Sequence, residues 1–538
     1  MLKTLQTHRL IIVIVVVGLL LRLWGVAFGL PRLYDPDEWQ WVGRALRMLH
    51  DRDPSPHWFG HPGTTLMYLL SVIYVVVFVV GVAVGSLSGP AEFEALYHRD
   101  PTLFYLSGRL LIVLFGTATI VGVYLIARRL AGRDTGLLAA IVLAVSPTHV
   151  LYSKLIRGDV PIGFLTLVAL WFCLNAVENR RWRDYLAAGF VTGLAVATKY
   201  TAAILVASIA LSHLEAIRWK VRDLWEHSRL TGSGVACLAG WFVGSPFLFF
   251  EYQTTLSDIS YEARARHLGA TGAGYVRDLL WYMADPLPRA LTWLGVLLGG
   301  LGILAFLGCK RRKERVVAAT PILFLGFISC HSLRWERWIV PIIPLLCVPL
   351  ARMISLAAER LLPALRARHR RWLAIGLLAL IAVPLVRADL AQGQGLTRPD
   401  TRTMAGEWML ANLPAGSRVL MESGTPQLPK DAFVFFTVES EGTLRRVDPA
   451  AEDRFLFIPD GSIGWLSDAR FLTEEHIRYL VMSNRYDRYL AEEERYGDVV
   501  WGYESILKRV VLIYEIPGNT VVSGFNVGGP RIRVYEVH

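Results

Sequence analysis

The sequence predicts an α-helical polytopic membrane protein with a C-terminal soluble α/β domain. Two observations support this fold class: 54% of the 538 residues are hydrophobic and 19% are charged, and apolar runs of membrane-spanning length recur up to about residue 390. Beyond that point the composition becomes that of a water-soluble domain. We therefore expect a transmembrane domain over residues 1–392 and an extracytoplasmic α/β domain over residues 393–538.

The formal net charge of +11 does not point to nucleic acid. In a membrane protein, excess Lys and Arg gather in cytoplasmic loops and beside anionic headgroups, so we expect membrane lipids as partners and no nucleic acid. The five cysteines lie in or at the ends of apolar runs and show no CxxC spacing. They predict neither a disulfide framework nor a zinc site.

The first apolar run covers residues 10–28 and follows Lys3, His8 and Arg9. This order predicts a cytoplasmic amino terminus. A cleavable signal peptide is the alternative, but the many later segments favour an uncleaved helix. Those segments cover residues 63–87, 102–127, 135–151, 160–177, 184–198, 201–217, 231–250, 290–308, 316–333, 337–356 and 372–390.

Basic loops predict the sidedness of these segments. Lys and Arg gather at residues 128–133, 180–183, 218–222, 310–315 and 360–371, and the positive-inside rule places all five loops in the cytoplasm. This placement of the five loops requires that residues 63–87 make no net crossing of the membrane. It also requires that the chain break near Thr198-Lys199, so that two segments form there. Eleven crossings then lead to an outer carboxyl terminus, within an expected total of about 11–13 transmembrane helices. The loops 29–62, 152–159, 251–289 and 331–337, with the turn at Lys199, all emerge on the outer face.

The C-terminal region shows alternating helix and strand signals. Residues 400–413 have apolar positions at helical spacing, with Asp400 as the N-cap. Strand-like runs cover residues 418–421, 454–458, 478–482, 509–515 and 531–536.

Three carboxylates, Asp35, Asp37 and Glu38, crowd into the first outer loop, directly after the first apolar run. A partly desolvated carboxylate at a membrane surface can accept a proton from an acceptor group or bind a divalent metal. The alternative is structural: Asp37 caps a helix over residues 38–49 and Asp35 is exposed. The position favours a functional role.

Other ionisable residues are expected on the same face. His61 ends the first outer loop, where it is suited either to a phosphate or metal or to capping the next apolar run. Arg157 and Asp159 join two apolar segments and either form a loop staple or hold an anionic substrate and its acceptor.

Two cationic residues complete the set. Lys199 lies deep in an apolar run, where a charge costs on the order of 3 kcal/mol, so it marks a break or a buried anion. Snorkelling to the interface is its alternative. Arg337, beside Trp338, is suited to bidentate phosphate binding, or else forms an interfacial pair with Glu336.

Together these motifs resemble a C-type (GT-C) glycosyltransferase of the dolichyl-phosphate-mannose protein mannosyltransferase kind (family 39), to which the aminoarabinose lipid A transferases are related. The resemblance covers residues 1 to about 420. The matching residues are Pro36-Asp37-Glu38, His61-Pro62, Arg157-x-Asp159, Thr198-Lys199-Tyr200 and Arg337-Trp338-x-x-Pro341 with Pro344, followed by Asp400-Thr401-Arg402 with Trp408 and Leu413-Pro414.

The resemblance implies an enzyme of the inner (plasma) membrane, a hexosyl- or pentosyltransferase. It would move a sugar from a polyprenyl-phosphate donor to an extracytoplasmic lipid, glycan or protein by inverting displacement. Asp37 then corresponds to the catalytic aspartate, Glu38 to its neighbour and Asp159 to a second acidic position. Lys199 and Arg337 would lie near the donor phosphate. The remaining expected substrate-binding residues are Asp35, His61, Arg157 and Tyr200.

Three features depart from the family pattern. Pro-Gly follows His61 where many members have Pro-Pro, Trp338 replaces the usual Tyr, and Asp35 is additional. They leave the donor geometry and the metal requirement open. If a divalent ion (Mg²⁺ or Mn²⁺) is used, Asp37, His61 and Asp159 are the candidate ligands.

Two other functions are weighed against this one. A transporter or flippase of lipid-linked sugars would use the buried charges as a translocation path. A binding or scaffold protein would tolerate substitution of Asp37 or Lys199. Neither accounts for the ordered set of motifs.

Overall fold

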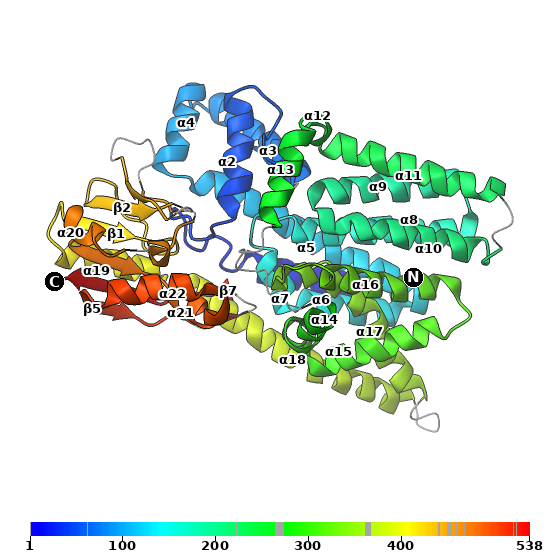
Figure 1. Cartoon of the computed structure of the whole chain (residues 1–538). Coiled ribbons are helices and arrows are strands. Elements are labelled where there is room, and N and C mark those ends of the chain that lie inside the picture. Colours follow the sequence, from blue (N-terminus) through cyan, green and yellow to red (C-terminus); the bar gives the residue numbers. More distant parts are fainter. Residues whose placement is uncertain are drawn as a thin grey trace. The chain divides into compact units, whose positions relative to one another are not determined.

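The computed structural model describes residues 2–61, 63–220, 224–263, 274–360, 367–439, 442–448, 455–458, 460–466, 468–519, 521–522 and 525–538. The chain divides into two compact units (Figure 1). Unit 1 comprises Met1–Trp24, Gln40–Val75 and Ser107–Ala391, and unit 2 comprises Gly25–Trp39, Val76–Leu106 and Gln392–His538. The division into domains at residue 392 stays a prediction.

Unit 1 is helical. The helices that lie wholly or mainly in it are α1 (Leu2–Leu23), α2 (Glu38–His50), α3 (Thr64–Ala83), α5 (Thr102–Ala131), α6 (Arg133–Ala144), α7 (Pro147–Tyr152), α8 (Asp159–Asn179), α9 (Trp182–Thr198), η1 (Tyr200–Ile204), α10 (Leu205–Ala216), α11 (Leu224–Gly244), α12 (Phe247–Phe250), α13 (Tyr252–Glu262), α14 (Tyr275–Ala284), α15 (Pro286–Leu307), α16 (Arg312–Ser329), η2 (Glu336–Ile339), α17 (Ile342–Arg360) and α18 (Ala367–Thr397).

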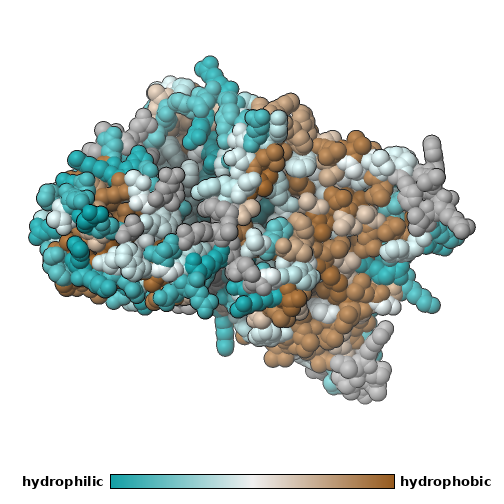
Figure 2. All heavy atoms as spheres, viewed as in Figure 1, coloured by the Kyte–Doolittle hydropathy of each residue, from teal (hydrophilic) through white to brown (hydrophobic). Residues whose placement is uncertain are grey.

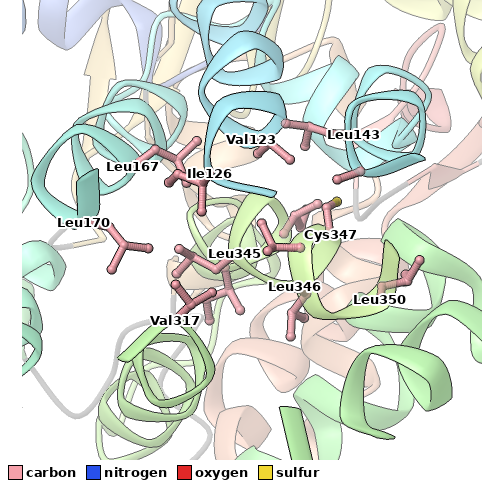
Figure 3. Packing of buried hydrophobic residues seen from close by; sticks show 14 of the residues in the cluster. Val123, Ile126, Leu143, Leu167, Leu170, Val317, Leu345, Leu346, Cys347 and Leu350 are labelled. Carbon is pink, nitrogen blue, oxygen red and sulfur yellow. The ribbon is translucent and has the colours of Figure 1, made fainter. Parts of the chain in front are cut away.

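The core of unit 1 forms where α5, α6, α8, α16 and α17 meet. Val123, Leu143, Leu167, Val317 and Leu345 come from these five helices and point toward one another (Figure 3). All five are 2% exposed or less. Because side chains from distant parts of the sequence interlock here, the helix ends that carry the polar residues of the sequence motifs are held in fixed positions.

Within the described residues, six segments are long and apolar enough to cross a membrane: Thr64–Ala83, Thr102–Ala131, Asp159–Asn179, Pro286–Leu307, Ile342–Glu359 and His369–Asn412. Hydrophobic side chains cover the surface over many of the helices of unit 1, and hydrophilic ones cover much of the sheet of unit 2 (Figure 2). The chain is therefore a polytopic membrane protein. The higher number of crossings and their direction remain predictions.

The break expected near Thr198-Lys199 is confirmed. Helix α9 ends at Thr198, Lys199 is extended (φ −162°, ψ 131°), and the 3-10 helix η1 begins at Tyr200. A buried cation within an apolar run cannot be left in a regular lipid-facing helix at low cost, and here the backbone turns at that residue.

The predicted outer loop 251–289 contains helices that the sequence analysis did not identify, and its position outside the membrane stays a prediction. Helices α13 and α14 occupy the parts that are described. Neither helix is apolar along its whole length, so hydropathy alone did not distinguish them from loop. Their amphipathic pattern was the available signal.

Within its described residues, unit 2 contains a six-stranded sheet in the order β3-β2-β1-β4-β8-β5. Strand β1 pairs in parallel with β2 and β4, whereas β3 and β8 pair antiparallel with their neighbours. The strands are β1 (Arg418–Met421), β2 (Val434–Val438), β3 (Leu444–Arg446), β4 (Tyr479–Met482), β5 (Val510–Ile516) and β8 (Ile532–Val537), and β6 (Val521–Val522) with β7 (Phe525–Asn526) forms a separate pair.

The helices of unit 2 are α4 (Pro90–Arg99), α19 (Thr401–Asn412), η3 (Ile463–Trp465), α20 (Phe471–Glu474), α21 (Arg485–Leu490) and α22 (Glu493–Leu507). The side chain of Asp400 accepts a hydrogen bond from the Arg402 amide, which confirms the predicted N-cap of α19. Buried Met409 of α19 packs with Val419 of β1 and Val481 of β4 in the domain core.

The expected strand at 454–458 was wrong. Arg454 lies outside the described residues, and Phe455 forms only an isolated bridge to Pro429. Proline has no amide hydrogen, so Pro429 cannot extend a hydrogen-bonded ladder. The other four predicted strands correspond to β1, β4, β5 and β8.

Candidate functional site

The acidic motif of the first outer loop is ordered by Asp35. Its Oδ1 accepts hydrogen bonds from the amides of Asp37 (2.9 Å) and Glu38 (3.3 Å), at the start of α2. Asp35 and Glu38 are each 1% exposed, whereas Asp37 is half-buried. The structural alternative expected an exposed Asp35, and on that point it was wrong. Asp35 accepts the two amides in the manner of a helix cap.

Asp159 and Lys199 form a buried ion pair in unit 1. The ammonium group of Lys199 donates to Asp159 Oδ1, and the two side chains are 16% and 3% exposed, respectively. Asp159 begins α8 and Lys199 lies in the break after α9. The structure thus brings together two residues predicted for the site, which the sequence separates by 40 positions.

Two arginines surround this pair. Both Arg157 and Arg337 interact electrostatically with Lys199. The phenol of buried Tyr152, at the end of α7, lies within the field of Glu336, of Arg157 and Arg337, and of Asp159. Arg337 also lies over the Trp335 ring, 4.7 Å from its centroid. These contacts join the loops after α7, α9 and α16 into one polar cluster.

A second carboxylate, Glu336, lies beside this cluster. Glu336 is 8% exposed and its Oε2 accepts from Arg289 at 3.2 Å. The cluster thus holds the cations Arg157, Lys199 and Arg337 together with the carboxylates Asp159 and Glu336. Arginine side chains are well suited to phosphate oxygens, so these cations are candidates for binding an anion.

The end of the first outer loop is hydrogen-bonded to both sides of the break. Tyr200 donates its hydroxyl to the Phe59 carbonyl at 2.9 Å, and the Gly63 amide donates to the Thr198 carbonyl at 3.1 Å. Gly63 has φ +54°, and a Cβ there would lie 1.6 Å from the Trp41 ring. Glycine is therefore required at position 63. Pro62 lies outside the described residues.

Gly158 allows a second close approach at the break. A Cβ on this residue would lie 2.9 Å from the Thr198 carbonyl oxygen. Glycine therefore lets the loop that carries Arg157 and Asp159 pack directly against the backbone beside Lys199.

His61 lies beside Glu262 and Trp58, and not beside the Asp159–Lys199 pair. Its Nε2 is 3.8 Å from Glu262 Oε2, and its ring meets Trp58 edge-on at 5.0 Å. Glu262 belongs to α13, which the sequence analysis treated as loop. Its role in holding His61 was therefore missed.

Helix α13 and Glu251, the residue directly before it, hold the first outer loop through carboxylates. Glu251 accepts from Ser55 and lies 3.0 Å from His57 Nδ1, and Asp258 accepts from the Phe59 amide at 2.7 Å. Asp258 and Glu262 stand at positions i and i+4 of α13, which places them on one face of the helix. That spacing was the signal in the sequence that could have identified the contact.

In the described part of the chain, the side chains do not form a set of ligands for the expected divalent ion. No group of three or more His, Cys, Asp or Glu side chains there is placed to hold a metal ion. Asp37, His61 and Asp159 therefore stay candidate ligands on sequence grounds.

Comparison with known proteins agrees with this architecture. The family model of dolichyl-phosphate-mannose-protein mannosyltransferases matches residues 105–243. A search of curated protein sequences finds no match to the chain. The structure resembles crystal structures of ArnT from Cupriavidus metallidurans, one bound to undecaprenyl phosphate and one in the apo state. In each case the TM-score is 0.51 and the identity 15%, over 97% of both chains.

The archaeal oligosaccharyltransferase of Archaeoglobus fulgidus is also similar. Its apo form gives a TM-score of 0.50 at 14% identity, over 96% of this chain and 80% of that chain. A second structure of this enzyme, AglB, in complex with an inhibitory peptide and a dolichol-phosphate gives the same values.

The fold is thus GT-C-like, with a helical membrane part and a C-terminal sheet domain. The resemblance expected from the sequence motifs is confirmed at this level: the chain is similar to GT-C glycosyltransferases.

Proposed function

We propose that this chain is a membrane glycosyltransferase that moves a sugar from a polyprenyl-phosphate donor to an extracytoplasmic lipid, glycan or protein. The observation that carries the proposal is the cluster of Arg157, Lys199 and Arg337 around buried Asp159. The ArnT structure bound to undecaprenyl phosphate and the AglB structure with a dolichol-phosphate support a lipid-phosphate donor.

The cationic cluster would bind the donor phosphate. During transfer the bond between the anomeric carbon and the phosphate oxygen breaks, and the electron pair stays on the lipid phosphate. Arg157, Lys199 and Arg337 would stabilise the negative charge that develops there. Preformed charges act most strongly where water is excluded, because they need no reorganisation during the reaction. Asp159 would hold Lys199 in place for this role.

The acidic motif would serve the acceptor. An acceptor hydroxyl is a poor nucleophile, so a carboxylate that accepts its proton as the new bond to the anomeric carbon forms would lower the barrier. Asp37 is the candidate because it is less buried than the two other carboxylates of the motif, Asp35 and Glu38. Attack opposite the departing phosphate inverts the anomeric configuration in a single displacement.

The proposed location follows from the charge pattern. The basic loops would face the cytoplasm, so the acidic motif, the Lys199 break and the C-terminal domain would be extracytoplasmic. In a bacterium this would be the inner membrane. A polyprenyl donor is confined to the membrane, which explains why the polar cluster lies where helices of membrane-spanning length end.

The test is sugar transfer in purified membranes. A labelled polyprenyl-phosphate sugar pool would be supplied, and label measured in the lipid, glycan and protein fractions. The wild type would be compared at matched expression with Asp37→Asn and with Asp51→Asn, whose side chain is 52% exposed. We expect transfer by the wild type and by Asp51→Asn, and loss of transfer in Asp37→Asn. The labelled fraction would identify the class of acceptor.

One observation favours an alternative, a transporter or flippase of lipid-linked sugars. Arg22, His149, Lys154 and Asp389 are all buried in unit 1, and neither oxygen of Asp389 has a hydrogen-bond partner among the described residues. Ionisable residues buried in membrane segments often mark translocation paths. Donor that crosses sealed vesicles without any label in product would favour this alternative, and turnover into product would exclude it as the main activity.

A further inference from the structure

The loop that carries the acidic motif belongs to the same compact unit as the C-terminal domain. Residues Gly25–Trp39 and Gln392–His538 are both parts of unit 2. The contacts between them centre on the residues directly before Asp35. This arrangement links the acidic motif to a domain whose role the sequence did not reveal.

Arg402, near the start of α19, makes the main contact. Its Nε and Nη2 donate to Asp400 at 2.8 Å each, which fixes the plane of the guanidinium group. Nη1 then donates to the Tyr34 carbonyl at 2.9 Å, and the guanidinium lies over the Tyr34 ring, 3.9 Å from its centroid. Arg402 and Tyr34 are 7% and 5% exposed. A planar, always charged group is needed to make these contacts together.

Two further contacts hold the same stretch. The Tyr34 hydroxyl lies 2.6 Å from Thr403 Oγ1. The side-chain amide of Gln427 accepts from the Leu33 amide at 2.8 Å and donates to the Leu33 carbonyl at 2.7 Å. Residues 33 and 34 are thus held through both backbone and side chain.

The next residue in the chain orders the acidic motif. Asp35 is buried and accepts from the amides of Asp37 and Glu38. A continuous set of contacts therefore leads from Asp400 and Arg402 through Tyr34 to the backbone of Asp37. Because Pro36 restricts the conformation of Asp35, a displacement of residue 34 is transmitted to residue 37 rather than absorbed between them.

We infer that Arg402 and Gln427 are positioning residues, through which the C-terminal domain sets the placement of the Asp37 carboxylate. The inference rests on the proposed function for its catalytic consequence. Reacting groups displaced by about 1 Å lose on the order of 100-fold in rate, so a positioning role predicts a large effect on kcat from residues that touch no substrate.

The experiment uses the full chain in detergent or lipid nanodiscs. The variants are Arg402→Gln, Gln427→Ala and Tyr34→Phe, and the matched control is Arg398→Gln, which changes an exposed arginine just before α19. Amide hydrogen exchange of residues 30–39, kcat and the donor KM per folded enzyme, and the melting temperature would be measured for each.

For Arg402→Gln we expect at least tenfold faster exchange in residues 33–38 and a fall in kcat of about 100-fold, with the donor KM within about twofold of the wild type. Gln427→Ala should also speed exchange in residues 33–38 and lower kcat. Tyr34→Phe should retain most activity, because the aromatic ring and the backbone carbonyl that Arg402 contacts remain. Arg398→Gln should match the wild type in every measurement.

The hydrogen-exchange result separates this inference from the proposed function. Unchanged exchange at residues 33–38 in Arg402→Gln would overturn the positioning role whether or not the wild type transfers sugar. A fall in activity that only tracks the loss of folded protein would also overturn it. Faster exchange without any wild-type transfer would keep the physical coupling and reject the glycosyltransferase proposal.

Discussion

Lys199 and Asp159 form a buried ion pair that joins the break after α9 to the first residue of α8. The contact connects two helix ends by a charge interaction at a place where the local backbone is irregular. The Asp159 side chain is 3% exposed and that of Lys199 16% exposed, so solvent alone stabilises their charges poorly. Asp159 needs Lys199 to remain ionised at low cost, and Lys199 needs Asp159 or a bound anion.

The first prediction separates the structural from the functional role of this pair. Lys199→Met should lower the free energy of unfolding by about 3–5 kcal/mol, because it leaves the Asp159 carboxylate buried without its partner. Combining Asp159→Leu with Lys199→Met should restore most of that stability while transfer stays abolished. Melting temperature and donor turnover in nanodiscs would be measured together.

The control for this prediction is an exposed ion pair. Arg445 and Glu439 are 67% and 50% exposed, so Arg445→Met should change stability by no more than about 1 kcal/mol. If the double variant at positions 159 and 199 transfers sugar like the wild type, the pair has only a structural role and the proposed phosphate site is wrong.

The second prediction concerns the two aspartates of the acidic motif. Asp35→Ala should destabilise the start of α2 by about 0.5–2 kcal/mol, whereas Asp35→Asn should retain most of the capping, because asparagine also accepts these hydrogen bonds. Asp37→Asn should abolish transfer with little change in melting temperature. Measured melting curves and turnover for the three variants would decide the assignment, and an active Asp37→Asn would move the catalytic role to another carboxylate.

The sequence predicted those features of the fold that have a local cause. A charge inside an apolar run identified the break at Lys199, and an aspartate before a helical pattern identified the cap of α19. Helices α13 and α14 were missed because their polarity resembles that of a loop. The bridge at Phe455 depends on Pro429, which is far from the predicted strand in sequence.

The same distinction applies to the candidate site. The chain brings Arg157, Asp159, Lys199 and Arg337 together, and each was identifiable as a charged residue at the end of an apolar segment. The bond between Arg402 and the Tyr34 carbonyl spans 368 positions. Neither residue is unusual in its local sequence, so only the fold could reveal this contact.

The third prediction is a pH dependence of the first outer loop. Hydrogen bonds to Glu251 and then to Asp53 raise the pKa of the His57 imidazole above its ordinary 6.5. A raised pKa in the folded state means that this stabilisation is full below pH 6.5 and is lost as the pH rises through the folded value. The amide of Ser55 and then His57 hold the pKa of Asp53 below 3.8, so the Asp53 contact is lost as the pH falls through that lower value.

Hydrogen exchange of residues 53–60, corrected for the intrinsic rate, would therefore be slower at about pH 5 than at about pH 9. The matched variant is His57→Asn, because His57 has φ 49° and asparagine tolerates this region of backbone space. In this variant, the exchange rate of residues 53–60 should no longer rise as the pH increases through the folded-state pKa of His57. The same pH profile in wild type and variant would mean that another group controls the loop.

The fourth prediction addresses the sidedness of α3. This helix is long and apolar enough to span a membrane, yet the positive-inside pattern requires that it make no net crossing. Residues Val76–Leu106, which include the second half of α3, belong to the same compact unit as the C-terminal domain, whereas the first half belongs to unit 1. We therefore expect α4 on the same side of the membrane as that domain.

Single cysteines at exposed positions would test this in a background from which the five natural cysteines have been removed. Ala95→Cys lies in α4, Ala415→Cys in the C-terminal domain and Asp134→Cys beside a basic loop, and all three positions are exposed. An impermeant thiol reagent applied to the outside of intact cells should label positions 95 and 415 but not 134. Labelling of 415 without 95 would show that α3 crosses the membrane. The basic loops could then not all face the cytoplasm, and the predicted direction of the following helices would have to be revised.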